Sequence, residues 1–202
     1  MTCDHGQLEP ARKVLNVGGN SKAIPIPACF SGWQHDLLDI DPRGNPDLLC
    51  DARELAQTPS RVYDAVYCSH NLEHYYQHDA IRVLTGFRMI LKKDGFAFIC
   101  VPDLLAVMKE TLEKGLDIED VLYESPSGPI RVHDVLYGYR MEMEASGNDF
   151  YAHKCGFTKV SLTTMLVANG FPHVFTAEEN LSLVAIAFKQ PPNECQKKLF
   201  GL

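Results

Sequence analysis

The sequence contains no long apolar segment, no Cys-x-x-Cys pair and no concentrated run of basic residues. Its apolar runs fall short of the roughly 18 residues that a membrane-spanning helix needs, and residues 1–12 lack the apolar core of a signal peptide. Its 19 basic and 26 acidic residues give a net charge of −7, which disfavours nucleic acid and anionic membranes as partners. These absences predict a cytoplasmic protein that binds neither.

The seven cysteines do not indicate a disulfide framework, because their number is odd and their spacing irregular. A reducing compartment fits them best. With 202 residues, 46% of them apolar and 22% charged, the chain has the composition of a globular protein and room for a single domain. A core of this size needs no metal or disulfide for its stability.

Short β-branched or apolar runs alternate with helical segments through residue 101. Pro25 and Pro27 limit the first crossover to one short helical turn at most, and the helical pattern of 80–91 is expected to end at residues 92–95, two lysines, an aspartate and a glycine. The alternation predicts an α/β fold with a Rossmann-like, mostly parallel sheet and helices on both faces. Strands are predicted at 13–17, 35–41, 47–51, 63–68 and 96–101.

The second half of the chain is less regular. Residues 104–123 read as helical, whereas 124–159 are rich in glycine, proline, histidine and aromatic residues without a sustained period. The whole segment 104–159 is therefore predicted to be a helical or irregular lid over the substrate. A helix at 160–169 and a hairpin of strands at 173–178 and 181–188 follow, which adds an antiparallel C-terminal edge strand. The tail after Gln190 shows no packing signal.

Candidate ligand-binding residues follow the ends of the predicted strands, where parallel sheets bind ligands. Gly18 and Gly19 end the first strand and allow the backbone to approach a ligand closely. Their spacing does not match the Gly-x-Gly-x-x-Gly motif that binds a pyrophosphate. Taken alone, two glycines are equally typical of a plain turn.

Two aspartates complete this pattern. Asp39 ends the second strand, from which a carboxylate can bind both ribose hydroxyls, although Asp41 competes for this role. Asp51 ends the third strand, where its carboxylate or the backbone of Ala52 could meet the amino edge of an adenine. Together with the glycines, these residues predict a nucleoside pocket without a pyrophosphate site.

These stretches resemble the motifs of class I S-adenosylmethionine (SAM)-dependent methyltransferases, and in particular the type-11-like group of predicted bacterial enzymes with a shortened first crossover. The resemblance covers nearly the whole chain, in order. The matching stretches are 14–19, 39–42, 50–53, 63–74, 91–95, 153–158 and 166–171.

The resemblance implies SAM as the cofactor. It implies that the two glycines face its methionine portion, that Asp39 binds the ribose, and that Asp51 and Ala52 bind the adenine. Asn16 stands where many members of the family carry an acidic residue. The predicted cofactor-binding residues are Gly18, Gly19, Asp39, Ile40, Asp51, Ala52, Ser69, His70 and Asn71.

Residues 70–74 also match the zinc-peptidase motif His-x-x-Glu-His. That motif lies within a helix, however, whereas this one follows a strand end and has no identifiable third ligand. We therefore expect no metal.

Methyl transfer to a hydroxyl or an amine benefits from a general base, and histidine is suited to that role. His70, His74, His133 and His153 are the candidates, of which His70 and His153 are predicted to be catalytic. The predicted substrate-binding residues are His74, His133, Tyr137 and Tyr151.

We thus expect a SAM-dependent methyltransferase that acts on oxygen or nitrogen of a small molecule or saccharide. One alternative is a module that binds SAM or S-adenosylhomocysteine (SAH) but has lost catalysis, which Asn16 and the sparse glycines suggest. A third is an NAD-dependent oxidoreductase. An exposed sheet edge or the lid could pair two subunits into a homodimer.

Overall fold

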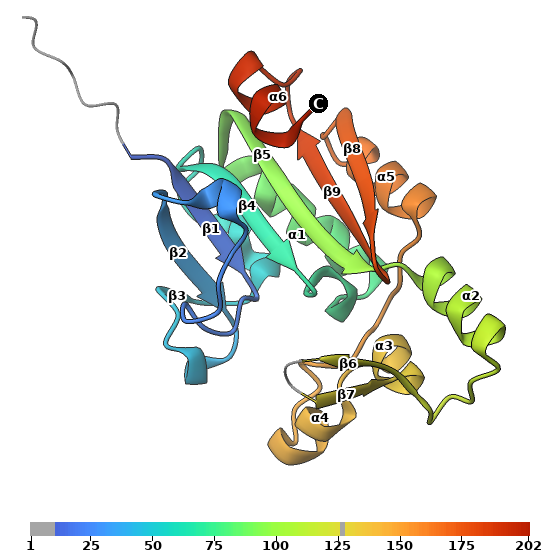
Figure 1. The fold of residues 1–202 in the computed structure, drawn as a ribbon. Coiled ribbons are helices and arrows are strands. Elements are labelled where there is room, and N and C mark those ends of the chain that lie inside the picture. Colours follow the sequence, from blue (N-terminus) through green and yellow to red (C-terminus); the bar gives the residue numbers. More distant parts are fainter. Residues whose placement is uncertain (1–10, 126–127) are drawn as a thin grey trace, which may run out of the picture.

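The computed structural model describes residues 11–125 and 128–202 (Figure 1). The prediction that the chain has no signal peptide falls mainly on residues 1–10, which lie outside the described residues.

A seven-stranded sheet forms the centre of the molecule. Its strands are β1 (Lys13–Val17), β2 (Gln34–Asp39), β3 (Leu48–Leu49), β4 (Tyr63–Ser69), β5 (Leu91–Pro102), β8 (His173–Glu179) and β9 (Ser182–Phe188). They lie in the order β3-β2-β1-β4-β5-β9-β8 (Figure 1). Neighbours among β1 to β5 pair in parallel, whereas β9 runs antiparallel to both β5 and β8. The predicted fold class is confirmed, with β8 as the edge strand and β9 inside it.

One face of the sheet packs against the main hydrophobic core. The 3-10 turn η3 (Ala52–Gln57) and the helices α1 (Gln77–Ile90) and α5 (Lys159–Ala168) cover this face, and buried residues of all three contribute to one cluster. The hydrophobic side chains of α1 recur at helical spacing, which is why this helix buries one side against the strands.

The opposite face carries less helix. The predicted short turn in the first crossover is confirmed as η1 (Ala28–Phe30), and α6 (Glu194–Phe200) lies at the amino-terminal end of β5 (Figure 1). The ring of Phe200 lies 5.1 Å from that of Phe96. The interpretation that the tail has no packing signal was therefore wrong: Asn193 caps a helix of seven residues, too short to show a hydrophobic period.

The helix predicted at 80–91 ends within one residue of the expected position, but the expectation that residues 92–95 close it was wrong. Helix α1 ends at Ile90, and β5 begins with Leu91, so residues 92–95 belong to a strand. Lys189 donates hydrogen bonds from its Nζ to the carbonyls of Arg88 and Leu91, at 2.9 and 2.8 Å. A side chain from beyond β9 thus satisfies the end of this helix, in place of a local glycine cap.

The segment 104–159 lies beyond the carboxyl ends of β4 and β5 (Figure 1). The prediction of helix over 104–123 was right only as far as Lys114, because Gly115 ends the helix in a left-handed conformation, and residues 124–159 are more regular than expected. Val107, Leu122, Val132 and Val135 form a small core of their own. The role of this segment as a lid stays a prediction. Its elements are α2 (Leu104–Lys114), β6 (Val121–Ser125), β7 (Gly128–Arg131), α3 (Val132–Tyr137) and α4 (Arg140–Ser146).

Candidate functional site

The glycine turn after β1 is required by close side-chain contacts. Gly18 has φ +71, and a Cβ at this position would lie 2.1 Å from Nδ2 of Asn71. A Cβ on Gly19 would lie 2.1 Å from Nδ2 of Asn16. Asn16 is buried, and its Oδ1 has no hydrogen-bond partner among the described residues. A buried amide oxygen of this kind is an available acceptor beside the turn.

Asp39 ties the end of β2 to this turn. Its side chain is 8% exposed, and the backbone N–H groups of Asn20 and Asp41 donate to its two oxygens, each at 2.9 Å. A carboxylate oxygen can accept more than one hydrogen bond. Asp39 can therefore keep these bonds and still accept from a pair of hydroxyls.

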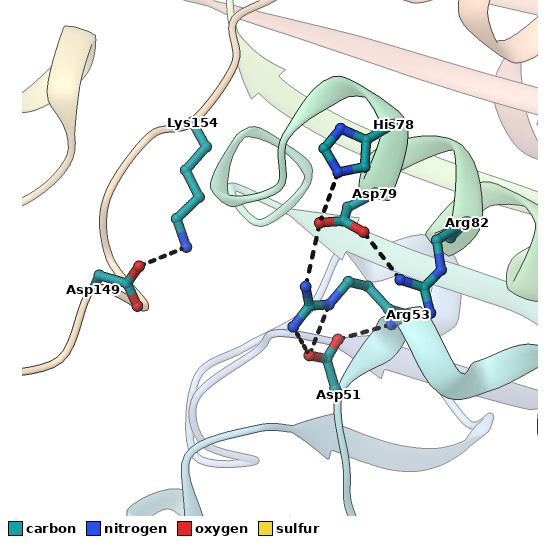
Figure 2. Close-up of polar contacts among 7 residues, drawn as sticks. All are labelled: Asp51, Arg53, His78, Asp79, Arg82, Asp149 and Lys154. Carbon is teal, nitrogen blue, oxygen red and sulfur yellow. Dashed lines mark hydrogen bonds and ion pairs between the residues drawn. The ribbon is translucent and has the colours of Figure 1, made fainter.

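Asp51 is held by its neighbour Arg53 (Figure 2). The backbone N–H of Arg53 donates to Oδ1 at 2.9 Å, and its guanidinium donates to Oδ2 from Nε and Nη2 at 2.9 and 2.5 Å. Burial raises the pKa of Asp51, but the hydrogen bonds of Arg53 outweigh this and lower the pKa below its usual range.

The same guanidinium reaches helix α1. Nη1 of Arg53 lies 3.2 Å from Oδ2 of the buried Asp79, whose other oxygen accepts from Arg82 at 3.2 Å (Figure 2). Asp51 follows β3 by two residues, caps η3, and is therefore oriented by a network that extends into the helix.

Arg43 joins this edge of the sheet to the segment 104–159. It belongs to the 3-10 turn η2 (Pro42–Gly44), and its guanidinium pairs with Asp41 at 2.6 Å and with Glu142 of α4 at 2.8 Å. It also donates to the hydroxyl of Tyr151 at 3.2 Å. These contacts hold the segment against the turn that follows β2.

A cavity of about 850 Å³ lies between the sheet and this segment. Four of the predicted residues line it: His70, His74, Tyr151 and His153. The glycines, Asp39 and Asp51 are not among the lining residues. The structure therefore separates a glycine–aspartate group at the ends of β1 to β3 from a histidine-rich pocket next to β4 and β5.

Glu73 lies at the centre of the histidines. It is part of the 3-10 turn η4 (Leu72–His74), is 1% exposed and lines the cavity. Neither of its carboxylate oxygens accepts a hydrogen bond from the residues that the structure describes. Its Oε1 lies 3.6 Å from Nδ1 of His70 and 4.0 Å from Nε2 of His153. Burial raises the pKa of Glu73, but contact with His70 and the charges of the surrounding histidines lower it below its ordinary value.

His70 and His153 are shifted in opposite directions. Burial lowers the pKa of His70, but its contacts with Cys100 and Glu73 outweigh this effect and raise the pKa to about 10. Burial is also the largest influence on His153, and here it prevails and lowers the pKa. At neutral pH, His70 is therefore an imidazolium and His153 a neutral imidazole.

The tautomer of His153 follows from its hydrogen bond. Nδ1 lies 2.8 Å from the carbonyl oxygen of Val135, so Nδ1 carries the proton and donates it. Nε2 is left with a lone pair on the side of Glu73. A neutral histidine held in this way can accept a proton.

His74 is engaged on both sides. Nδ1 lies 3.1 Å from the carbonyl of Ala152, and Nε2 lies 3.2 Å from the carbonyl of His70. Ligand atoms of Glu73, His74 and His153 lie within 4.8 Å of one another, as a metal site would require. However, both nitrogens of His74 face carbonyl oxygens, which suits a donor rather than a metal ligand. The expectation of no metal stays a prediction.

The remaining predicted residues lie elsewhere. Ile40 is exposed, and Ala52, the first residue of η3, is buried. Ser69, the last residue of β4, is half-buried. His133 and Tyr137 of α3 contact each other, with ring centroids 5.3 Å apart, and are not among the residues that line the cavity. Their role in substrate binding stays a prediction.

Sequence reasoning did not select Glu73 or Cys100 as site residues. Cys100 lies two residues before the end of β5 and lines the cavity. Its position at a strand end, opposite Ser69 of β4, was a usable signal. Its partner His70 was selected, but the contact between them depends on the pairing of β4 with β5.

No family model matches the sequence, and no curated protein matches it. Solved structures do match. A SAM-dependent methyltransferase from Archaeoglobus fulgidus has a TM-score of 0.55 at 15% identity, covering 89% of this chain and 86% of that chain. A SAM-dependent methyltransferase from Methanosarcina mazei has a TM-score of 0.55 at 15% identity, covering 92% and 95%.

A third match is 1,6-didemethyltoxoflavin-N1-methyltransferase from Burkholderia thailandensis, solved with 1,6-didemethyltoxoflavin and SAH bound. Its TM-score is 0.50 at 16% identity, covering 89% of this chain and 72% of that chain. The chain thus has the fold of the class I SAM-dependent methyltransferases, and the resemblance drawn from its motifs is confirmed at the level of the fold. Membership of the type-11-like group stays a prediction.

Within the described ranges 11–125 and 128–202, no helix has both the length and the apolar character needed to cross a membrane.

Proposed function

We propose that this protein is a SAM-dependent methyltransferase that methylates oxygen or nitrogen of a small molecule or saccharide. The observation that carries the proposal is the placement of a glycine–aspartate group and a large histidine-lined cavity at the carboxyl edge of one sheet. The solved structures that share this fold support it. The neighbour with a bound heterocycle supports a small-molecule acceptor.

The residues at the ends of β1 to β3 fit the cofactor. Asp39 has acceptor capacity for the ribose hydroxyls beyond its two backbone bonds. Asp51 and the backbone of Ala52 would hold the adenine, and the unpaired Oδ1 of Asn16 is available to the methionine ammonium. When bound, SAM supplies an electrophilic methyl group on a sulfonium.

The protein's own contribution to the reaction is alignment. The cavity removes the acceptor from water, and the contacts of Arg43 with Asp41, Glu142 and Tyr151 hold its outer wall in place. Orientation of two reactants can lower the activation barrier by about 7–11 kcal/mol. An in-line displacement therefore needs few catalytic groups.

We infer that His153 accepts the proton of the acceptor hydroxyl or amine. Its Nε2 carries a lone pair and its pKa is lowered, so the base form prevails at neutral pH. His70 was predicted for the same role, but its raised pKa makes it a cation that stabilises Glu73. In enzyme active sites, two neighbouring groups whose environments move their pKa values apart often act as the acid and the base of the reaction.

The alternative is a module that binds SAM or SAH without catalysis. It is favoured by Asn16, a neutral amide where many members of the family carry an acidic residue.

Calorimetric titration with SAH and with NAD tests the proposed cofactor. We expect SAH to bind in the micromolar range and NAD not to bind. Absence of SAH binding would overturn both the methyltransferase and the binding module. Binding of SAH without methyl transfer to any of a panel of phenols, amines and saccharides would favour the module.

A further inference from the structure

Cys100, His70 and Glu73 form a continuous array along the wall of the cavity. Sγ of Cys100 lies 3.6 Å from Nε2 of His70, and Nδ1 of His70 lies 3.6 Å from Oε1 of Glu73. All three residues line the cavity. A thiol, an imidazole and a carboxylate in this sequence of contacts match the arrangement that activates a cysteine nucleophile.

The backbone holds this array in place. The N–H of His70 donates to the carbonyl of Cys100 at 2.8 Å, which extends the pairing of β4 with β5 by one residue. His70 has φ +48, a left-handed conformation that a non-glycine residue adopts at an energetic cost. The pairing therefore fixes both the thiol and the imidazole at the same edge of the sheet.

Glu73 supplies an independent observation. A carboxylate that is 1% exposed and lacks hydrogen bonds to both oxygens is costly unless a charge compensates it. His70 lies 3.6 Å from this carboxylate, and contacts with Cys100 and with Glu73 together raise the pKa of its ring. An imidazolium next to a thiol stabilises its thiolate, which is the nucleophilic form.

We propose that Cys100, His70 and Glu73 are a nucleophilic thiol site, which takes soft carbon electrophiles such as α,β-unsaturated carbonyl compounds from the cavity. The thiolate of Cys100 forms an S–C bond with the β-carbon, and the π electron pair of the C=C bond moves to give an enolate. The enolate then takes the proton from His70. The adduct contains all atoms of both reactants, and no oxidant or further reagent is needed.

This site does not depend on methyl transfer, so it is tested without SAM or SAH. N-ethylmaleimide is the probe, used below one equivalent, and the alkylated peptides are quantified by mass spectrometry over time. Cys195 is the internal reference, because it is exposed and lies in α6. We expect the half-buried Cys100 to react faster than the exposed Cys195. Faster reaction of Cys195 would overturn the proposal.

The variants His70→Ala and Glu73→Gln test whether the array is responsible. Because His70→Ala removes the imidazole that contacts the thiol, we expect the rate at Cys100 to fall about tenfold in this variant and less in Glu73→Gln. The rate at Cys195 should stay constant, which shows that the change is confined to the site of Cys100. His78→Ala is the matched control, because this histidine is 77% exposed in its side chain and lies in α1. An unchanged rate at Cys100 in His70→Ala would overturn the proposal, whether or not the protein binds SAH.

Discussion

The two halves of the carboxyl edge of the sheet differ in how their polar groups are satisfied. At the ends of β2 and β3, each carboxylate already has internal donors: Asp39 has two backbone N–H groups, and Asp51 has Arg53. Next to β4 and β5, Glu73 is more deeply buried and has no hydrogen-bond partner in the described part of the chain. The carboxylates of the first half are thus oriented before any ligand binds. In the second half, the carboxylate of Glu73 is still available to interact with a molecule in the cavity.

This difference separates binding from chemistry. Groups that are oriented in advance bind a ligand at a low entropic cost. Buried charged groups that lack hydrogen-bond partners and have shifted pKa values are typical of catalytic positions. We therefore expect substitutions in the first half to change mainly the affinity for SAH, and substitutions in the second half to change mainly the turnover.

The largest expected effect is on turnover. His153→Ala should lower kcat by about 10²–10⁴-fold, the usual contribution of a general base, because Nδ1 of this ring donates to Val135 and leaves Nε2 free to accept a proton. Affinity for SAH should not change. The measurement is methyl transfer at saturating SAM, with His78→Ala as the control. Full turnover in His153→Ala would remove His153 as the base.

Asp39→Ala should come next. Two hydrogen bonds from ribose hydroxyls to a carboxylate, after the loss of competing water, contribute about 3 kcal/mol, so the Kd for SAH should rise about 100-fold. Calorimetry measures this effect. Asp94→Asn, an exposed acid at the opposite edge of the sheet, is the control. Equal affinity in Asp39→Ala would place the nucleoside elsewhere.

The pH profile should distinguish the two histidines. The pKa of His153 lies below the ordinary value of 6.5, so its base form persists above that value and is lost as the pH falls through the lowered pKa. Turnover at saturating substrates should therefore be constant through pH 7 and fall about tenfold per unit on the acid side, with its midpoint below pH 6.5. The groups that face this ring are Glu73, His74 and His70. An acid midpoint above pH 7 would contradict the assignment.

The lowered pKa of His153 also makes the stability of the folded protein depend on pH. Because the unfolded chain binds the proton of His153 more tightly than the folded chain does, its contribution to stability is lost as the pH falls below 6.5 towards the folded pKa.

The smallest expected effect is that of Arg53→Ala. The guanidinium is partly exposed and orients Asp51 rather than contacting a ligand itself. Its removal should raise the Kd for SAH by about fivefold, because the loss of an orienting contact costs about 1 kcal/mol of binding free energy. Arg82→Ala, which leaves Asp51 paired with Arg53, is the control. A lower Kd in Arg53→Ala would show that Arg53 competes with adenine for Asp51.

Much of the fold could be predicted because its signals are local. The run of residues 13–17 and the glycines after it indicate a buried strand without any knowledge of its neighbours, and β1 has the predicted bounds. The end of α1 was predicted to within one residue, but the group that satisfies its carbonyls could not be, because it is the side chain of Lys189, about 100 residues away. Helix α6 and strands β6 and β7 are too short to show a period.

The candidate site divides in the same way. Asp39 and Asp51 each follow a strand, so their shared edge can be inferred from the order of elements alone. The contact of Glu73 with His153 depends instead on residues 104–159 folding back over the sheet. The homodimer, the cytoplasmic location and the absence of nucleic-acid partners stay predictions.

The sequence by itself determined the class of fold, the parallel strands and the positions of the acids at their ends, because hydrophobic periodicity and turn residues act over a few neighbours. Only the tertiary structure decided which of these groups have hydrogen-bond partners or a compensating charge nearby. Burial of Glu73, the opposite protonation of His70 and His153, and the approach of Cys100 to His70 all arise from packing between distant segments. Desolvation and charge–charge interactions depend on groups that are close in space but distant in sequence, so a local sequence pattern cannot predict them.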